Sequence, residues 1–453
     1  MSDVRIICRL IAALLALGAS AAAETAETPQ RAAAAKALAE VSAYASSILM
    51  NDDGSGRSDY NLVASEWLIY ETHWHTGQLI YGLVEAGAVL DAPGLIAAAR
   101  RAGDWWAGTE FREPHPFAGL VNAKHGDRLG RLINWTTISD GAPGLFRLSE
   151  ATGDAKYADA ATRSGVWLWD NTRVPDTVKG GEGLFYNLFD PKTGVVLTDW
   201  NAHVRGGERD AARVAAEGPS PVEEVARPNI EGFLFADMCA HLDEKVWCDR
   251  FLEQASHALA RQDDNGLWMD FEPNDRKSGR VHPRFNIWNA EALLKAFEIS
   301  GERKYLEGAA KTARFYRDAA TKDGAIFYRT FVDQPAARTG VTGSAVAFNG
   351  VLMLGLRRHG LDEFDDAIKT AVDWILANRF STDHPDPNLA GAVVNTRLKV
   401  RKSGVRYINR DVGSTFAMRF LADYLRSDLA ERSRPGGALN RTHGGIGGND
   451  DGR

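Results

Sequence analysis

The hydrophobic pattern divides most of the chain into pairs of helices. Apolar residues recur at helical spacing in segments 150–171 and 298–319, and the two segments begin alike. Each starts with an acidic residue, reaches a glycine and a second acid three to four positions later, and continues through Lys-Tyr into an amphipathic run. Glycine ends one helix and the acid caps the next, so the repeated corner predicts a tight turn inside a helical hairpin.

Weaker copies of this corner keep only a Leu-Asp pair, at Leu90, Leu242 and Leu361. Each of the five second helices follows another apolar helix. The first helices are expected at 78–89, 144–151, 231–241, 290–300 and 344–359, and the second helices at 90–108, 150–171, 242–262, 298–319 and 361–378.

A sixth hairpin can be built from the two ends of the pattern. Helix 31–50 has no partner at the start, and helix 414–429 has none at the end. Pairing them closes a ring and leaves no apolar end exposed. We therefore predict an all-α fold, an (α/α)6 toroid of six inner and six outer helices. A linear solenoid is the alternative, but it needs capping helices with polar outer faces.

A second repeated piece follows each second helix. It is a glycine leading into a short apolar stretch, as in Gly183-Leu-Phe-Tyr-Asn, and it recurs at Gly119, Gly266, Gly324 and Gly391. These pieces predict turns into short β-like loops on one rim of the ring. Their irregular spacing is typical of a repeat array that carries loops of different lengths on one face.

The first 23 residues resemble an export signal. Arg5 and Arg9 precede a short apolar run at 10–18, which is too short to span a membrane, and small residues at 19–23 offer a cleavage site. We expect a periplasmic or secreted protein with its toroid domain at 24–430. The tail 431–453 is rich in glycine and polar residues and is expected to be disordered.

Two cysteines remain after the signal, Cys239 and Cys248. In an oxidising compartment they could form a disulfide across a hairpin, or they could stay as thiols. The net charge of −7 gives no basic footprint for nucleic acid. The 12 tryptophans suit either core packing or stacking on sugar rings.

The ring suggests where a site would lie. Parallel inner helices open their N-termini on one rim, so the segments leading into them should share one cleft. Those segments bring arginines that suit carboxylates and sulfate-like groups, tryptophans, and carboxylates at or near helix starts. The residues are Arg227, Arg284, Arg338, Arg410, Trp74, Trp135, Trp288, Asp140, Glu231, Asp411 and, just ahead of its helix, Glu71. Such a cleft suits a poly- or oligosaccharide, with an anionic sugar preferred.

The same segments contain histidines, but no metal site follows from them. His73 and His75 are separated by one residue, a spacing that suits a strand or loop. No third ligand lies at a spacing typical of a metal site. His73 is instead a candidate for substrate binding. The sequence has no phosphate loop or dinucleotide fingerprint in a compatible position, so no cofactor is predicted.

The helix corner Thr-Gly-Asp-X-Lys-Tyr-X-X-Ala at 152–160, echoed at 300–308, resembles the six-hairpin glycosidase superfamily. The stretch 138–148 is similar to the segment that carries a catalytic Asp in unsaturated glucuronyl hydrolases, and Asp140 is the matching position. The stretch from Arg284 resembles a later segment in which Arg and Trp hold the substrate, although the family's Trp-X-Arg-Gly-Gln motif is absent there.

These residues support three hypotheses. In a glycoside hydrolase, Asp140 is the general acid, Glu231 or Glu71 is the second carboxylate, and Arg284 and Arg410 hold a substrate carboxylate. In a uronate lyase or epimerase, Tyr407 or His282 is the base, and Asn286 and the two arginines surround the acid group. In a non-catalytic glycan-binding factor, the toroid only carries the groove.

Overall fold

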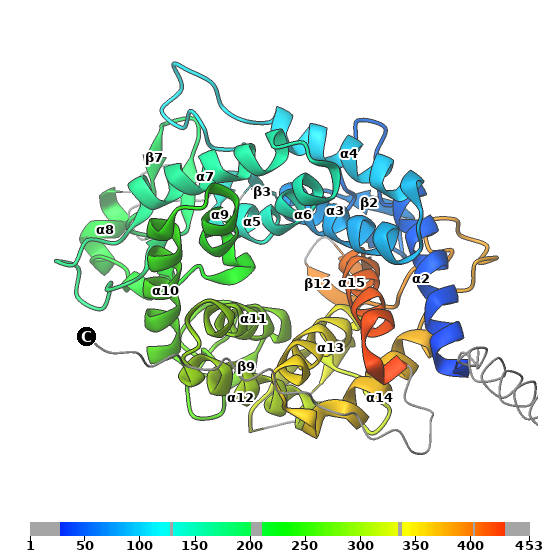
Figure 1. Cartoon of the computed structure of the whole chain (residues 1–453). Coiled ribbons are helices and arrows are strands. Elements are labelled where there is room, and N and C mark those ends of the chain that lie inside the picture. Colours follow the sequence, from blue (N-terminus) through cyan, green and yellow to red (C-terminus); the bar gives the residue numbers. More distant parts are fainter. Residues whose placement is uncertain (1–27, 127–129, 201–210, 334–337, 402–403, 431–453) are drawn as a thin grey trace, which may run out of the picture.

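The computed structural model describes residues 28–126, 130–200, 211–333, 338–401 and 404–430, and its helices form a closed double ring (Figure 1). The inner helices are α3 (Thr72–Val89), α6 (Ala142–Thr152), α9 (Leu234–Leu242), α11 (Pro283–Ser300), α13 (Gly343–Arg358) and α15 (Val412–Arg426). The outer helices are α2 (Pro29–Ser47), α4 (Pro93–Gly108), α7 (Lys156–Thr172), α10 (Lys245–Ala260), α12 (Arg303–Ala319) and α14 (Asp365–Ala377).

The ring closes through the two ends of the helical pattern, as predicted. The first helix, α2, packs against the last, α15, and α15 in turn packs against α3. Arg31 donates to the carbonyl of Leu425 at 2.9 Å, and the hydroxyl of Tyr424 donates to Gln30 at 2.7 Å. The all-α (α/α)6 fold is therefore confirmed, and the linear solenoid is excluded. The predicted signal at 1–23 and tail at 431–453 lie outside the described residues.

Two inner helices begin well before the residues that the sequence pattern indicated. α3 begins at Thr72 and α11 at Pro283, about two turns before the expected starts. The side chain of His282 caps α11 by accepting from the backbone N–H of Phe285, and Pro283 occupies the first turn. The polar segments leading into these helices are thus their own first turns, so their side chains follow the helical period.

Short helices and strands complete the rims. The helices are α5 (Trp135–Ser139), α8 (Ala211–Glu217) and the 3-10 turns η2 (Val222–Glu224), η3 (Glu231–Phe233), η4 (Asp362–Phe364) and η5 (Asp428–Ala430). One sheet has the order β12 (Thr396–Arg401), β13 (Gly404–Arg410), β1 (Asp59–Asn61), β2 (Glu66–Leu68). A second is β11 (Thr339–Val341), β10 (Phe327–Phe331), β9 (Arg280–Val281), and a third is β3 (Lys124–Gly126), β4 (Gly130–Asn134), β6 (Leu188–Asp190), β7 (Val195–Val196). β5 (Phe185–Tyr186) pairs with β8 (Ala226–Arg227).

The five repeated glycines sit in turns, as predicted. All five have positive φ, between 69° and 91°, a conformation that other residues rarely adopt. Gly183 and Gly324 lead into β5 and β10. The cysteines also connect two elements, because a disulfide joins Cys239 on α9 to Cys248 on α10.

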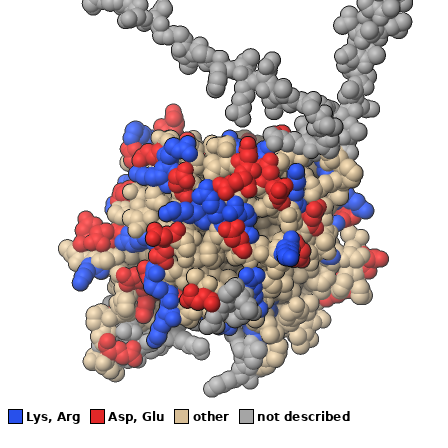
Figure 2. All heavy atoms as spheres, turned by 90° about the horizontal axis from the view of Figure 1, so that it is seen from below, with Lys and Arg blue, Asp and Glu red and all other residues tan. Residues whose placement is uncertain are grey.

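The surface is mixed in charge. On the face seen in Figure 2, lysines and arginines are interspersed with aspartates and glutamates. Within the described ranges, no helix is both long and apolar enough to cross a membrane.

Candidate active site

A cavity of about 690 Å³ opens at the rim where the inner helices begin. It is formed by helix starts and strands that are far apart in the sequence. Nine of the residues predicted for the site line it: Glu71, Trp74, Asp140, Arg227, Glu231, His282, Arg284, Trp288 and Arg410.

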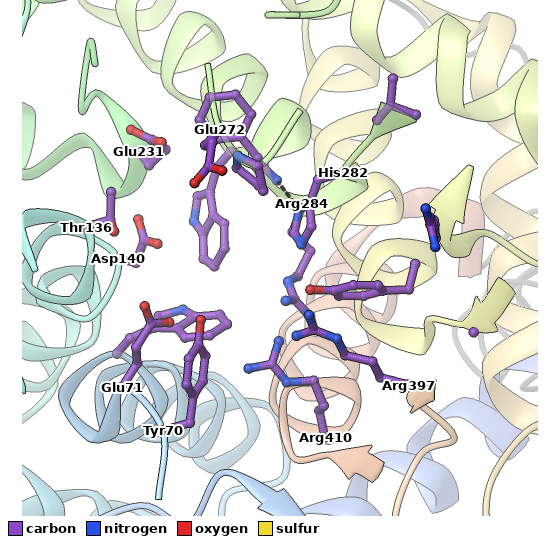
Figure 3. Close-up of a pocket in the computed structure, with 18 of the residues that line it drawn as sticks. Tyr70, Glu71, Thr136, Asp140, Glu231, Glu272, His282, Arg284, Arg397 and Arg410 are labelled. Atoms are coloured by element: carbon purple, nitrogen blue, oxygen red, sulfur yellow. Dashed lines mark hydrogen bonds between the residues drawn. The ribbon is translucent and has the colours of Figure 1, made fainter. Parts of the chain in front are cut away.

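The cavity has two chemically opposite sides (Figure 3). Glu71, Asp140 and Glu231 form one side, which we call the acidic wall. Arg284, Arg397 and Arg410 form the other, which we call the basic wall. A ligand in this cavity is therefore placed between acids and cations.

The acidic wall depends on a very close crossing of α3 and α6. A Cβ atom on Gly77 would lie 2.1 Å from the carbonyl oxygen of Gly141, and one on Gly144 would lie 2.1 Å from that of Gly77. No side chain larger than hydrogen fits at either position. This contact lets the amide of Gln78 donate to the carbonyl of Asp140, so the start of α3 and Asp140 are held together.

Glu231 is brought to Asp140 by a second close approach. Gly232 has φ of 74°, and a Cβ on it would lie 2.0 Å from the carbonyl oxygen of Ser139. Strained backbone surrounds this turn, since Asn229 and Phe233 have φ of 50° and 42°. Left-handed conformations of non-glycine residues cost about 1–3 kcal/mol each and cluster at functional sites.

Burial raises the pKa of both carboxyl groups, and the shift is larger for Asp140, so Asp140 is the one that keeps a proton beside an ionised Glu231. Burial raises the pKa of Asp140 well above its usual value, and the charges of Glu231 and Glu71 raise it further, while Arg227 and Arg284 oppose the shift. Burial also raises the pKa of Glu231, and Arg227 counteracts it. Among the residues described, Asp140 Oδ1 and Glu231 Oε2 are buried and have no hydrogen-bond partner. Both oxygens therefore lack a hydrogen-bond donor from the described part of the protein.

Glu71 differs from the other two acids because neighbouring side chains already bind its carboxylate. Its Oε1 accepts from the amide of Asn134 at 3.3 Å and lies 3.3 Å from His125 Nε2. Its backbone has φ of 42° at the N-cap of α3. Glu71 is the less available of the two candidates for the second carboxylate.

Arg284 and Arg410 face the cavity over aromatic rings. Arg284 lies 5.3 Å from the ring centre of Trp74 and donates to Ser344 Oγ at 3.0 Å. Burial lowers its pKa to about 10, with the neighbouring Arg410 adding to the shift. Arg410 Nε is held by Asp59 Oδ1 at 2.6 Å. Burial opposes the charge of Arg410, but Asp59 raises its pKa above the usual value overall. Both arginines stay charged at neutral pH.

Each of these two arginines keeps an unused donor. Within the described part of the chain, Arg284 Nε and Arg410 Nη2 are buried without a hydrogen-bond partner. Arg397 adds a third guanidinium, 4.6 Å from the ring centre of Tyr328. Guanidinium groups bind carboxylates and sulfates through paired N–H donors, so the basic wall is an anion site.

His282 is neutral and its tautomer is fixed by the fold. Burial and then the charges of Arg284, Arg397 and Arg410 lower its pKa well below the usual value. Its Nδ1 accepts from the backbone N–H of Phe285 at 3.3 Å, so the neutral ring carries its proton on Nε2. In this state His282 can donate a hydrogen bond into the cavity, but it cannot take a proton at Nε2.

Six predicted site residues do not line the cavity, and four of these are held in buried contacts. Trp135 is in the core and donates to Thr172 Oγ1, while Asn286 donates to the hydroxyl of Tyr316. His73 contacts Thr109 Oγ1 at 2.7 Å, and burial lowers its pKa to about 3. The carboxylate of Asp411 lies 2.6 Å from His75 Nδ1. For His73 and Asn286 the helical period explains this, because Trp74 occupies the cavity side of α3, and Arg284 and Trp288 occupy that of α11.

The other two residues lie in a strand or beside one: Tyr407 in β13 and Arg338 just before β11. Tyr407 is 40% exposed on β13. Successive side chains of a strand point to opposite faces, and Arg410, three positions on, faces the cavity, so Tyr407 faces away from it. Arg338 stacks 5.7 Å from the ring centre of Phe327, outside the lining.

Sequence reasoning missed several lining residues, most of which strands bring to the site: His125, Arg280, Tyr328, Arg329, Arg397 and Lys399 from strands, Tyr70 from an isolated bridge and Glu272 from a turn. One signal was present. In Thr396–Arg401, basic residues alternate with apolar ones, which predicts a strand with a basic face. Among the described residues, no group of three or more His, Cys, Asp or Glu side chains could hold a metal ion.

Comparison with known proteins bears on the fold alone. No protein-family model matches the chain, and no curated protein matches it in sequence. In structure it is similar to a sugar epimerase from a ruminal bacterium (TM-score 0.60, 14% identity, 86% of this chain and 98% of that one). It is also similar to cellobiose 2-epimerase from Bacillus thermoamylovorans B4167 (0.59, 10%, 83% and 94%) and to a D-mannose isomerase (0.56, 13%, 86% and 96%). The chain thus has the six-hairpin (α/α)6 architecture that the helix corner predicted.

Proposed function

We propose that this protein is a carbohydrate-active enzyme, specifically a glycoside hydrolase that acts on an acidic, uronate-containing poly- or oligosaccharide. One observation carries the proposal: a buried pair of carboxyl groups, Asp140 and Glu231, faces a wall of three arginines across one cavity. The sugar-processing proteins with the same architecture support the broader class.

In this proposal Asp140 is the general acid. Its raised pKa keeps the proton that the leaving glycosidic oxygen must receive as the C–O bond breaks. Glu231, whose charge Arg227 stabilises, is the ionised partner. It either activates the water that attacks the sugar carbon or attacks that carbon itself. Glu71 is the second choice for this role.

The basic wall gives the substrate its orientation. The unused donors of Arg284 and Arg410 bind a sugar carboxylate, and Arg397 adds charge from β12. Trp74 and Trp288 also line the cavity and offer aromatic surface, and Trp74 lies beside both arginines. A substrate held this way presents its glycosidic bond to the acidic wall, and this positioning supplies much of the rate.

A uronate lyase or epimerase is the second candidate, and the basic wall is the observation that favours it, since such enzymes must stabilise an enolate. The candidate bases favour it less. His282 carries its proton on the nitrogen that is free, and Tyr407 faces away from the cavity. Tyr70 also lines the cavity, but burial raises its pKa well above the usual value, so it stays protonated and cannot act as the base.

We also propose that the protein works outside the cytoplasm, after removal of residues 1–23. The Cys239–Cys248 disulfide supports this, because disulfides persist mainly in oxidising compartments.

The test is a panel of uronate polymers and oligomers, assayed together for reducing ends and for ultraviolet absorbance. A hydrolase releases reducing ends without new absorbance. New absorbance from unsaturated products would indicate a lyase, and altered sugar stereochemistry without cleavage would indicate an epimerase. Binding without any product would leave only the glycan-binding factor.

A further inference from the structure

A second cavity, of about 930 Å³, adjoins the candidate active site. Glu272 and Arg280 line both cavities, so they form the boundary between them. The rest of this side cavity is lined by residues from segments 188–200, 221–224 and 261–277. We infer that the side cavity binds further sugar units of the chain that is cleaved, so that the substrate is longer than a disaccharide. This inference rests on the proposed function.

The volumes support an extended substrate. A pocket that binds one small ligand has a volume of about 300–1,000 Å³, and each of the two cavities falls in this range alone. A disaccharide held between the acidic and basic walls therefore leaves the side cavity empty. Only a longer chain fills both.

The side cavity has the lining that a sugar requires. Trp200, Met269 and Phe271 supply apolar surface, and Glu223 and Glu224 supply acceptors for hydroxyl groups. This lining differs from the basic wall, and it suits units that present hydroxyl groups.

Trp200 is fixed in position. Its side chain packs on the cluster of Leu132, Leu188 and Leu197. Its backbone N–H donates to Ser220 Oγ at 2.8 Å, and the carboxylate of Asp199 accepts from Ser220 at 3.1 Å. A half-buried tryptophan that is held on one side and lines a cavity on the other is a platform for a sugar ring.

Arg280 supplies a polar contact at the boundary. In the described structure its Nε is buried without a partner. Two nearby cations are already used: Arg276 pairs with Asp263 and Asp270, and Arg261 donates to the carbonyl of Glu182. A sugar oxygen that crosses from one cavity to the other would satisfy Arg280.

The experiment measures kcat/KM for oligosaccharides of two to six units with wild type, Trp200→Ala and the control Trp167→Ala. Trp167 is also half-buried, lies on the outer helix α7 and lines neither cavity. We expect kcat/KM to rise with length beyond two units. Loss of a tryptophan anchor should reduce that rise by about tenfold in Trp200→Ala, with the disaccharide changed by less than about twofold.

The outcomes separate the two proposals. A flat length profile in wild type, or an equal loss on short and long substrates in a folded Trp200→Ala variant, overturns the side cavity as a subsite. If no length is cleaved, the hydrolase proposal fails, and affinities measured by calorimetry decide the inference. Affinity that increases with length and depends on Trp200 supports it, and affinity independent of Trp200 overturns it.

Discussion

The two walls of the cavity are built in opposite ways. The acids of the acidic wall come from the starts of inner helices, which approach each other so closely that Gly77, Gly144 and Gly232 admit no side chain. The basic wall comes partly from strands, and its most buried cation, Arg410, is held by Asp59. Asp140 and Glu231 have free oxygens and raised pKa values, whereas Arg410 is neutralised in part by its own counter-ion.

This contrast suggests different roles for the acidic wall and the basic wall. Carboxyl groups buried close together, with Arg227 offsetting only part of the shift in their pKa values, are poised to exchange protons. Guanidinium groups anchored at one edge, with donors left over, are poised to bind an anion. The predictions below separate chemistry on the acidic wall from binding on the basic wall.

The largest effect is expected for Asp140→Asn. Loss of a general acid lowers kcat by about 10²–10⁴-fold, and the amide cannot donate the required proton. Reducing-end assays on a uronate oligosaccharide measure the loss, and circular dichroism checks that the fold is kept. Turnover above about a tenth of wild type would remove Asp140 from the mechanism.

Arg284→Ala should act mainly on binding. Removing one charge-assisted contact costs about 2–5 kcal/mol, so KM for an acidic substrate should rise by at least about thirtyfold. The same substrate with its carboxylates reduced to alcohols should show little change between variant and wild type. An equal loss on both substrates would show that Arg284 does not recognise the carboxylate.

Gly232→Ala tests the geometry that joins Glu231 to Asp140. The new methyl group would meet the carbonyl of Ser139, and alanine disfavours the positive φ, so we expect a stability loss of about 1–3 kcal/mol together with reduced kcat. Gly94→Ala is the matched control, because no atom lies within 4 Å of its added Cβ. Chemical denaturation measures both variants, and a Gly232→Ala enzyme as stable and active as the control would contradict the account.

The raised pKa of Asp140 predicts that Asp140→Asn, unlike Gly232→Ala, makes the protein more stable at neutral pH. A carboxyl with a higher pKa in the folded state stabilises the fold below its unfolded value of about 4, and this contribution is lost as the pH rises through the folded value. An asparagine side chain cannot ionise, so the Asp140→Asn variant does not lose stability in this way as the pH rises. The variant should therefore melt above wild type at pH 7, and the difference should shrink toward pH 4. A lower Tm than wild type at pH 7 would mean that the carboxylate is stabilised in the fold.

The smallest effect is expected for Tyr407→Phe. Because Tyr407 faces away from the cavity, kcat should stay within about twofold of wild type, far from the loss that follows removal of a general base. A loss of a hundredfold or more would favour the lyase or epimerase mechanism.

The sequence predicted helices better than it predicted strands. Helix corners, capping acids and the unpaired end helices were enough for the ring, because each is a local signal repeated along the chain. Asp140 and Glu231 of the acidic wall could also be predicted, because they lie at or near the starts of helices that the pattern indicates. Arg397 was missed because β12 reaches the cavity through β13, which pairs with the distant strand β1, and Tyr70 because an isolated bridge ties it to the distant Gly126. Trp135 and Asn286 were misplaced because the early helix starts turn them toward the core.

The most direct test of this division between the walls is a crystal structure of Asp140→Asn with a bound uronate oligosaccharide. The account predicts a sugar carboxylate within hydrogen-bonding distance of Arg284 or Arg410 and a glycosidic oxygen facing position 140. A sugar carboxylate bound beside Glu231, or a glycosidic bond directed toward the arginines, would contradict it.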